Sequence, residues 1–320
     1  MLARPSFWMI VSVTLVFAVL PLATGDANLR ENLIIIAVAI ALASNLNLMI
    51  GYTGYVNFGN VVAYGLGGYI GLYLTTVTGW PLLAAAIGAG IAVSLFTLVF
   101  GLAILRLRGA YFGLATIGIL EAVRTFASNF SPWGSAAGLY VSMSAYQPLG
   151  GPMRAVWIAY LAVVAVMGIS MLLSLFVKRS KFGLGLFAIR EDEDAAVVLG
   201  VNATVYKSVV YSISAFLPAV VGALIFYKNG MIDPGGAFDL SLSIEAIVML
   251  LLGGRGTVTG AVIGAALYEQ LRGYLLTSPS FTNFHLVITG GLLLIIILFA
   301  PEGLIGGLYR LLPRARRVFE

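Results

Sequence analysis

Nine charged residues lie within residues 178–207, a thirty-residue stretch of an otherwise strongly apolar chain. At its centre, Arg190 is followed by four acidic residues, 191–194, and Gly200 comes six positions later. Carboxylates favour the positive N-terminal end of a helix dipole, and glycine favours the position just past a helix end. The pattern therefore predicts a short helix with an acidic first turn in a solvated segment.

Two interpretations of this helix follow from its residues. Ala195, Ala196 and Leu199 fall on one face at helical spacing, and they are small enough to let another surface approach. The segment is then either a solvated loop with a surface helix or a helix that docks on a cytoplasmic partner. The residues alone leave both open.

A second polar interruption reads GYTGYVNFGN, residues 51–60. It carries Tyr52, Thr53 and Asn57 between apolar runs. Backbone that is not helical at membrane depth must be buried in protein or line a water-filled cavity. The stretch is therefore either a discontinuous helix beside a substrate path or a glycine-rich connecting turn.

Charged residues are scarce within the apolar runs themselves. Glu121 and Arg124 lie three positions apart, on one helical face, and Glu245 lies in a short apolar run. An unpaired charge at membrane depth costs about 2.5–3.5 kcal/mol on insertion scales. We therefore expect Glu121 and Arg124 to form an internal pair, which either borders a pathway or fixes helix packing.

Composition sets the fold class. The chain has 320 residues, of which 60% are hydrophobic and 10% charged, whereas soluble domains carry about 25% charged residues. We predict an all-α polytopic membrane protein, because runs of about twenty apolar residues span a bilayer as helices. The chain has no cysteine, which excludes disulfides and cysteine-ligated metals. Its net charge of +5 comes from residues at span ends and does not indicate nucleic-acid binding.

Ten membrane crossings place every basic cluster on one side. These clusters are Arg4, the pair Arg106 and Arg108, the segment 178–207 and the tail 301–320. Positive residues favour the cytoplasm, so both termini are expected there. The count requires the short run 241–252 to cross the membrane; the fallback is eight crossings plus re-entrant segments. The predicted spans with defined bounds are 7–24, 33–50, 82–105, 155–177, 258–276 and 285–300.

Several catalytic motifs are absent from the sequence. There is no GxxxxGK[ST] phosphate loop, no HExxH metal pattern and no GxSxG nucleophile elbow. We therefore expect no catalytic residue, no metal site and no cofactor bound by this chain.

The chain resembles the transmembrane permease subunit of branched-chain amino acid ABC importers, of the LivM type. The resemblance covers roughly residues 33–305. It is carried, in family order, by GYTGYVNFGN, RLRGAYFGLATIGILEAVR, SKFGLGLFAIREDEDAAVVLGVNATVYK, SIEAIVMLLLGGRGTVTGAVIGAAL and APEGLIG. The AIREDEDAAVVLGV segment is the most specific of these.

This resemblance implies a single permease domain, 1–320, in the plasma (inner) membrane of a prokaryote. It would pair with a second permease subunit as a heterodimer, with two ATP-binding cassette ATPases that use the ATP, and with an extracytoplasmic substrate-binding protein. The stretch 178–207 would be the cytoplasmic coupling loop, and 301–320 a basic cytoplasmic tail. The residues expected to couple to an ATPase are Ala188, Arg190, Glu191, Asp192, Glu193, Ala195, Ala196 and Gly200.

The resemblance also implies a pathway for branched-chain, hydrophobic amino acids. The residues expected near that pathway are Tyr52, Thr53, Asn57, Glu121, Arg124, Ser243 and Glu245. The sequence departs from the family pattern at 55–57, Arg255 and Thr257, which leaves the cargo open. Urea or short amides are the alternative cargo. An ion-coupled secondary carrier is the alternative mechanism, and Glu121 with Arg124, or Glu245, would be its ionisable groups.

Overall fold

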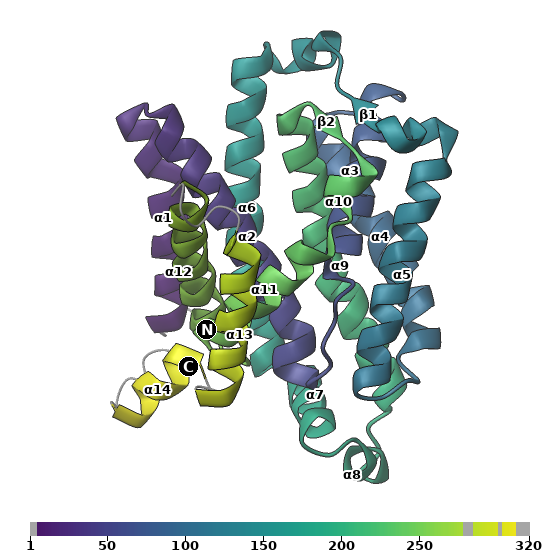
Figure 1. Cartoon of the computed structure of the whole chain (residues 1–320), viewed down its shortest axis with the longest axis vertical. Coiled ribbons are helices and arrows are strands. Elements are labelled where there is room, and N and C mark those ends of the chain that lie inside the picture. The colour runs from purple at the N-terminus through teal and green to yellow at the C-terminus, as the bar shows by residue number, and fades with distance from the viewer. Residues whose placement is uncertain (1–4, 278–283, 300–302, 312–320) are drawn as a thin grey trace.

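The computed structural model describes residues 5–277, 284–299 and 303–311, and these are almost continuously helical (Figure 1). The helices are α1 (Pro5–Thr24), α2 (Ala27–Thr53), α3 (Asn60–Thr76), α4 (Leu82–Ile104), α5 (Ala110–Asn129), α6 (Pro152–Arg179), α7 (Lys181–Glu191), α8 (Glu193–Val198), α9 (Ala203–Asn229), α10 (Pro234–Ala237), α11 (Leu240–Gly253), α12 (Val258–Thr277), α13 (His285–Phe299) and α14 (Gly303–Leu311). Two short strands, β1 (Leu139–Tyr140) and β2 (Met231–Ile232), pair antiparallel.

Seven helices in the described part of the chain are long and apolar enough to cross a membrane. They are α1, α2, α4, α5, α6, α9 and the stretch Pro234–Gly253, which joins α10 to α11. The prediction of an all-α polytopic membrane protein is therefore confirmed. The count of ten would add α3 with 17 residues, α13 with 15 residues and the more polar α12, so ten remains a prediction.

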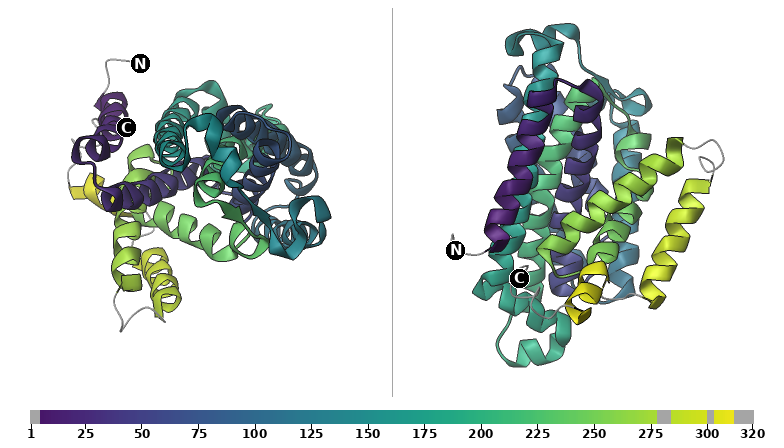
Figure 2. Two further views of the ribbon diagram at one scale, coloured as in Figure 1. Left: turned by 90° about the horizontal axis from the view of Figure 1, so that it is seen from above. Right: turned by 90° about the vertical axis from the view of Figure 1, so that its left-hand side faces the viewer.

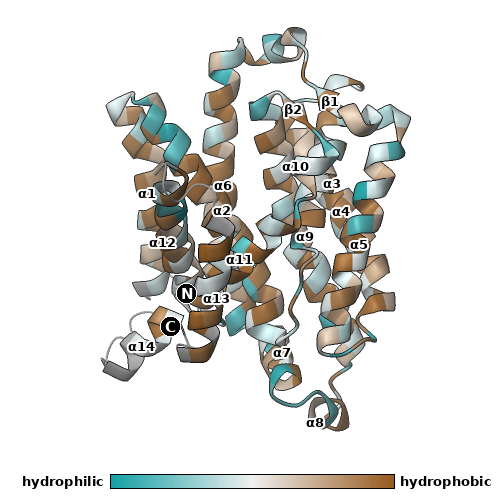
Figure 3. Cartoon of the chain, viewed as in Figure 1, coloured by the Kyte–Doolittle hydropathy of each residue, from teal (hydrophilic) through white to brown (hydrophobic). Residues whose placement is uncertain are grey.

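The long helices run between two ends of the molecule (Figure 1). At one end lie α7, α8 and α14; at the other, β1 and β2 join the loop after α5 to the loop after α9. Seen from above in Figure 2, α12 and α13 lie at one edge of the helix group, and α4 and α5 lie at the opposite edge. Apolar residues cover the long helices, and polar residues gather mostly near their ends (Figure 3).

The centre of the helix group is the crossing of α3 and α9. The small-residue spacing of Gly67 and Gly71 predicts close helix packing, and the structure confirms it. A Cβ atom at Gly67 would lie 2.1 Å from the carbonyl oxygen of Ala219, and one at Gly222 would lie 1.9 Å from that of Tyr64. The two backbones approach so closely that only glycine fits between them.

The sequence misplaced one helix start. The span predicted over 33–50 begins earlier in the structure, because α2 already starts at Ala27 and includes Arg30 and Glu31. The Asp26 carboxylate accepts a hydrogen bond from the Asn28 amide at 2.8 Å, which caps the helix and lets it begin before the apolar run. Of the predicted basic tail 301–320, residues 301–302 and 312–320 lie outside the described residues. So do residue 300 of the last predicted span and Arg4 of the predicted basic clusters.

Candidate functional site

The polar segment folds into two helices, α7 and α8, at one end of the molecule (Figure 1). The Ser180 hydroxyl caps α7 by accepting a hydrogen bond from Gly183 N at 3.0 Å. The Asp192 carboxylate caps α8 by accepting one from Ala195 N at 3.0 Å. Gly200, with a φ of +90°, follows its end. The predicted short helix with an acidic first turn is therefore confirmed as α8; that α7 forms a second helix was not predicted.

Helix α8 presents apolar side chains to solvent at this end of the molecule. Val198 is 86% exposed and Leu199 82% exposed, and Ala195 beside them is also exposed. Ala196, by contrast, is 1% exposed and packs into an apolar cluster with Leu186. The prediction that Ala195, Ala196 and Leu199 form one face open to another surface is therefore wrong for Ala196, because its side chain packs α8 against the rest of the protein.

The acidic residues of α8 divide between solvent and interior. Glu193 accepts hydrogen bonds from the Tyr55 hydroxyl and from Lys207 Nζ at 2.8 Å, and Arg108 Nε lies 3.5 Å from it. Lys207 is only 1% exposed. Asp194 is exposed and pairs with Arg108 at 2.9 Å. The hydrogen bond and the positive charge of Arg108 hold the pKa of Asp194 below its ordinary value.

Arg190 is also directed inward. Its guanidinium donates a hydrogen bond to the carbonyl oxygen of Gly51 at 2.7 Å, at the end of α2. Burial, and then the nearby charge of Arg255, lower the pKa of Arg190. Among the predicted coupling residues, those exposed to solvent are Glu191, Asp192, Ala195 and Gly200. Those at least partly buried are Ala188, Arg190, Glu193 and Ala196.

The interruption at 51–60 is a break between α2 and α3, and its polar groups are buried. Tyr52 shares a hydrogen bond with Ser174 on α6 at 2.8 Å. Thr53 donates to a carbonyl one turn earlier, and Asn57 accepts from a nearby amide. The Ser243 hydroxyl accepts a bond from the amide of Val61, near the start of α3. Within this chain, the hydrogen bonds of these predicted pathway residues therefore hold the backbone around the α2–α3 break in place.

Glu121 and Arg124 form the expected pair on α5, with 3.7 Å between Oε1 and Nη1. Their side chains are 56% and 44% exposed. The expectation of an internal pair is therefore wrong for this chain, because α5 lies at the edge of the helix group (Figure 2). The pair faces outward, where lipid, water or another subunit would contact it.

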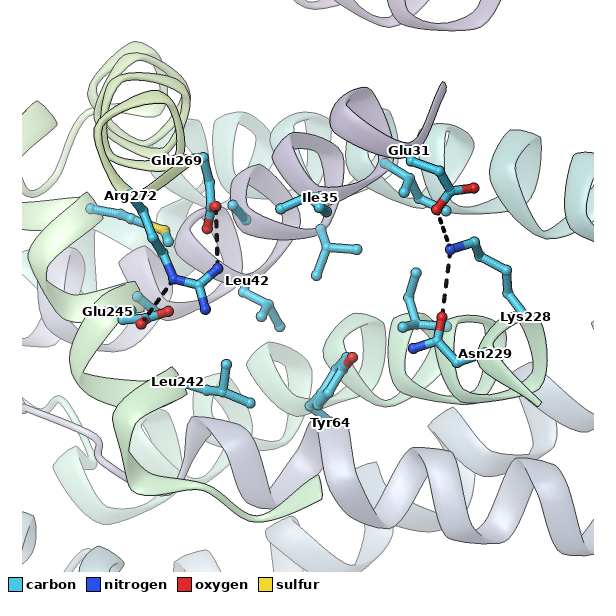
Figure 4. A pocket seen from close by; sticks show the side chains of 16 residues that line it. Glu31, Ile35, Leu42, Tyr64, Lys228, Asn229, Leu242, Glu245, Glu269 and Arg272 are labelled. Atoms are coloured by element: carbon cyan, nitrogen blue, oxygen red, sulfur yellow. Dashed lines mark hydrogen bonds and ion pairs between the residues drawn. The ribbon is translucent and has the colours of Figure 1, made fainter. Parts of the chain in front are cut away.

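Glu245 lies in a cavity of about 300 Å³ between α2, α9, α11 and α12. Glu245 accepts from Arg272 at 3.2 Å, and Glu269 lies 3.7 Å from the same guanidinium. Lys228 pairs with Glu31 at the opposite end (Figure 4). The middle of the cavity is apolar and is lined by Ile34, Ile35, Val38, Leu42, Leu242 and Met249. The cavity thus has two charged ends and an apolar middle.

Comparison with known proteins identifies the family. Residues 29–297 match the family model described as branched-chain amino acid transport system / permease component. The chain belongs to this family. It is similar to the high-affinity branched-chain amino acid transport system permease protein LivM of Salmonella typhimurium, at 25% identity over 83% of this chain and 67% of that protein.

The permease has further relatives of the same kind. It is 28% identical to BraD of Pseudomonas aeruginosa and 26% identical to LivH of Salmonella typhimurium, in both cases over 83% of this chain and 90% of the relative. Both relatives are likewise described as high-affinity branched-chain amino acid transport system permease proteins. No solved structure matches the chain. The family consists of transport subunits rather than enzymes.

Sequence reasoning missed three residues that surround Glu193 at the α7–α8 end of the permease. Tyr55, Lys207 and Arg108 surround Glu193, although they come from the α2–α3 break, from α9 and from the turn before α5. The available signal was weak. Lys207 follows the capping residue Asn202 and stands at the start of an apolar run, where a charge usually stays in water.

Proposed function

We propose that this permease is the membrane subunit of an ATP-binding cassette importer that carries branched-chain amino acids. Movement would be driven by ATP hydrolysis in partner subunits and would alternate access between the two sides of the membrane. The observation that carries the proposal is α8. It projects from one end of the helix group and exposes Val198 and Leu199 beside the acidic Glu191, which is 80% exposed.

An apolar tip of this kind favours a protein partner. Monomeric soluble surfaces rarely expose large apolar side chains next to one another without a partner to cover them. We assign that partner as an ATPase subunit, with 178–207 as the coupling loop of a single permease domain, 1–320. The assembly would contain two ATPases, a second permease subunit and an extracytoplasmic binding protein.

The membrane topology we propose has ten crossings in a prokaryotic inner membrane. Helices α3, α12 and α13 would supply the three crossings beyond the seven long apolar helices. The coupling loop, the tail 301–320 and both termini would then lie in the cytoplasm. Arg106 and Arg108, in the turn after α4, support this orientation because positive residues favour the cytoplasmic side.

The cavity between α2 and α12 supports a cargo with charged and apolar parts. An amino acid with a branched side chain carries both, and the cavity offers charged ends around an apolar middle (Figure 4). We therefore propose Glu245 and the Lys228–Glu31 pair as groups that cargo meets. The Glu121–Arg124 pair would border the path once the second permease is present, as would the polar groups of Tyr52, Thr53, Asn57 and Ser243.

Uptake by proteoliposomes tests this function. The permease is co-expressed with its genomic partner permease and ATPases, and the binding protein is added outside the vesicles. Labelled leucine uptake is then measured with and without internal ATP. We expect ATP-dependent leucine uptake that an excess of urea or acetamide does not reduce. Competition by urea or acetamide would instead assign the alternative cargo. Uptake driven by a proton or sodium gradient without ATPases would refute the importer.

A docking variant tests α8 separately. Val198→Asp/Leu199→Asp should abolish co-purification of the ATPases, because two charges would replace the apolar tip. Met143→Asp is the matched control, since Met143 is 74% exposed and follows three residues after β1, which lies at the opposite end of the molecule. Normal ATPase recovery with the α8 variant would contradict the docking role.

A further inference from the structure

Two hydrogen bonds connect the α7–α8 segment to the break between α2 and α3. Arg190, near the end of α7, donates to the carbonyl oxygen of Gly51 at 2.7 Å. Glu193, in the first turn of α8, accepts from the hydroxyl of Tyr55. The two anchor points lie four residues apart, where α2 ends and the backbone leaves the helix. The segment that carries the exposed tip is thus fixed directly to a place where the helical pattern is interrupted.

The Glu193 contact is reinforced by a buried cation. Lys207 donates to Glu193 at 2.8 Å and to the Tyr55 hydroxyl at 2.9 Å, and its ammonium lies 4.4 Å from the centre of the Tyr55 ring. Lys207 is 1% exposed and the Glu193 side chain 15% exposed. Separating such a pair would leave a charge without its partner in a poorly solvated place. The cluster therefore resists opening and moves as one unit with α8.

The end of α2 is also connected to the turn between α11 and α12. Asn47 donates to the carbonyl oxygen of Thr257 at 3.1 Å and accepts from the amide of Gly256 at 2.8 Å. A Cβ atom at Gly51 would lie 2.7 Å from the Gly256 nitrogen, so the two backbones are in close contact. Displacement of the α2 end would therefore reach the helix pair that forms one wall of the charged cavity.

We infer that Arg190, Tyr55, Glu193 and Lys207 form a linkage that carries movement of α8 to the α2–α3 break and, through Asn47, to the α11–α12 turn. These are positioning residues, since none of them is assigned a contact with cargo or nucleotide. The inference rests on the proposed function, because it requires an ATPase that moves α8. Beyond that function, the inference names the internal contacts that transmit the movement of α8 to the membrane-spanning helices.

The test removes the two connections without stranding the buried charge. The double variant Tyr55→Phe/Arg190→Gln keeps the Lys207–Glu193 pair, so the buried ammonium of Lys207 still has a carboxylate partner. Tyr211→Phe is the matched control, because Tyr211 is buried in the same apolar cluster and contacts Phe112 from another side. The single variant Tyr55→Phe serves as a milder second perturbation.

Leucine transported per ATP hydrolysed is measured in proteoliposomes for each assembled complex. The double variant should recover ATPases as the unaltered chain does and should lose roughly 5–150-fold in that ratio, the usual range of coupling between sites. Tyr55→Phe should show a smaller loss, and Tyr211→Phe no loss. An unchanged ratio in the double variant would overturn the linkage.

A distance measurement tests rigidity directly. The chain has no cysteine, so spin labels can be placed at Leu184→Cys in α7 and Val56→Cys in the break. These side chains are 67% and 39% exposed. The distance between the labels should stay constant on ATP binding in the unaltered background and change in the double variant. Equal changes in both would overturn the linkage, whereas failure of the unaltered chain to recruit any ATPase would overturn the proposed function itself.

Discussion

The close crossing of α3 and α9 makes a strong quantitative prediction. In Gly222→Ala, the added Cβ would lie 1.9 Å from the carbonyl oxygen of Tyr64 on α3. Carbon and oxygen in a close Cα–H···O contact are about 3.3 Å apart, so α3 and α9 must separate by about 1.4 Å along this contact. A gap of about 0.5–1 Å already forfeits a quarter to a half of each dispersion contact, so about 40 contacts of about 0.15 kcal/mol would lose about 2–3 kcal/mol. Overpacked cores lose a similar amount, about 1–3 kcal/mol.

A matched glycine isolates this packing effect. Gly118, inside α5, has no atom within 4 Å of its Cβ position. Gly118→Ala gains the same helix propensity as Gly222→Ala, up to about 1 kcal/mol, and creates no clash. The free energy of unfolding is measured for each variant in detergent micelles by SDS titration, followed by tryptophan fluorescence. We expect Gly222→Ala to be less stable than Gly118→Ala by about 2–3 kcal/mol. Equal stabilities would refute the close crossing.

Three further predictions concern the α7–α8 end of the molecule and the contacts of the α2 end. Asn47→Ala should cost about 1–3 kcal/mol in the same unfolding assay, because two buried backbone groups of the α11–α12 turn lose their partner. Lys207→Met should cost about 3–5 kcal/mol, whereas Lys207→Met/Glu193→Gln should cost less, because no buried charge is left unpaired; a double variant as unstable as the single one would contradict this. The folded pKa of Asp194 is lowered by Arg108, so their ion pair is fully formed at neutral pH and is lost only as pH falls below the ordinary aspartate value, 3.8. A carboxyl NMR titration of Asp194 should show a midpoint below that value, and Arg108→Gln should restore it.

The sequence was sufficient to predict most of the helices. Apolar runs near twenty residues must be helical in a bilayer, because lipid offers no hydrogen-bond partner to the backbone. The run 82–105 became α4 and the run 155–177 became α6, each within three residues of the predicted ends. Helix α8 could be predicted for a similarly local reason, since its cap at Asp192, its acidic first turn and Gly200 act within a few residues of one another.

The sequence predicted the candidate site only in part. It located the polar segment with its short acidic helix, but it treated the four acidic residues as equivalent. The structure separates Glu191, which is 80% exposed, from Glu193, which is 15% exposed. It also places Glu245 with Arg272, twenty-seven positions later, in the wall of a cavity. Neither outcome follows from helical spacing.

Local pattern therefore determined most of the helices, many of their ends, and that the chain belongs in a membrane. Tertiary structure alone decided which charges meet. Glu193 turns inward because Tyr55 and Lys207, on separate elements, converge on it. Glu121 with Arg124 stays exposed because, among the described residues, no helix covers the face of α5 that carries them. The physical reason is that a helix cap acts over a few residues, whereas an ion pair depends on how whole helices pack, and packing brings together residues whose separation in sequence carries no signal.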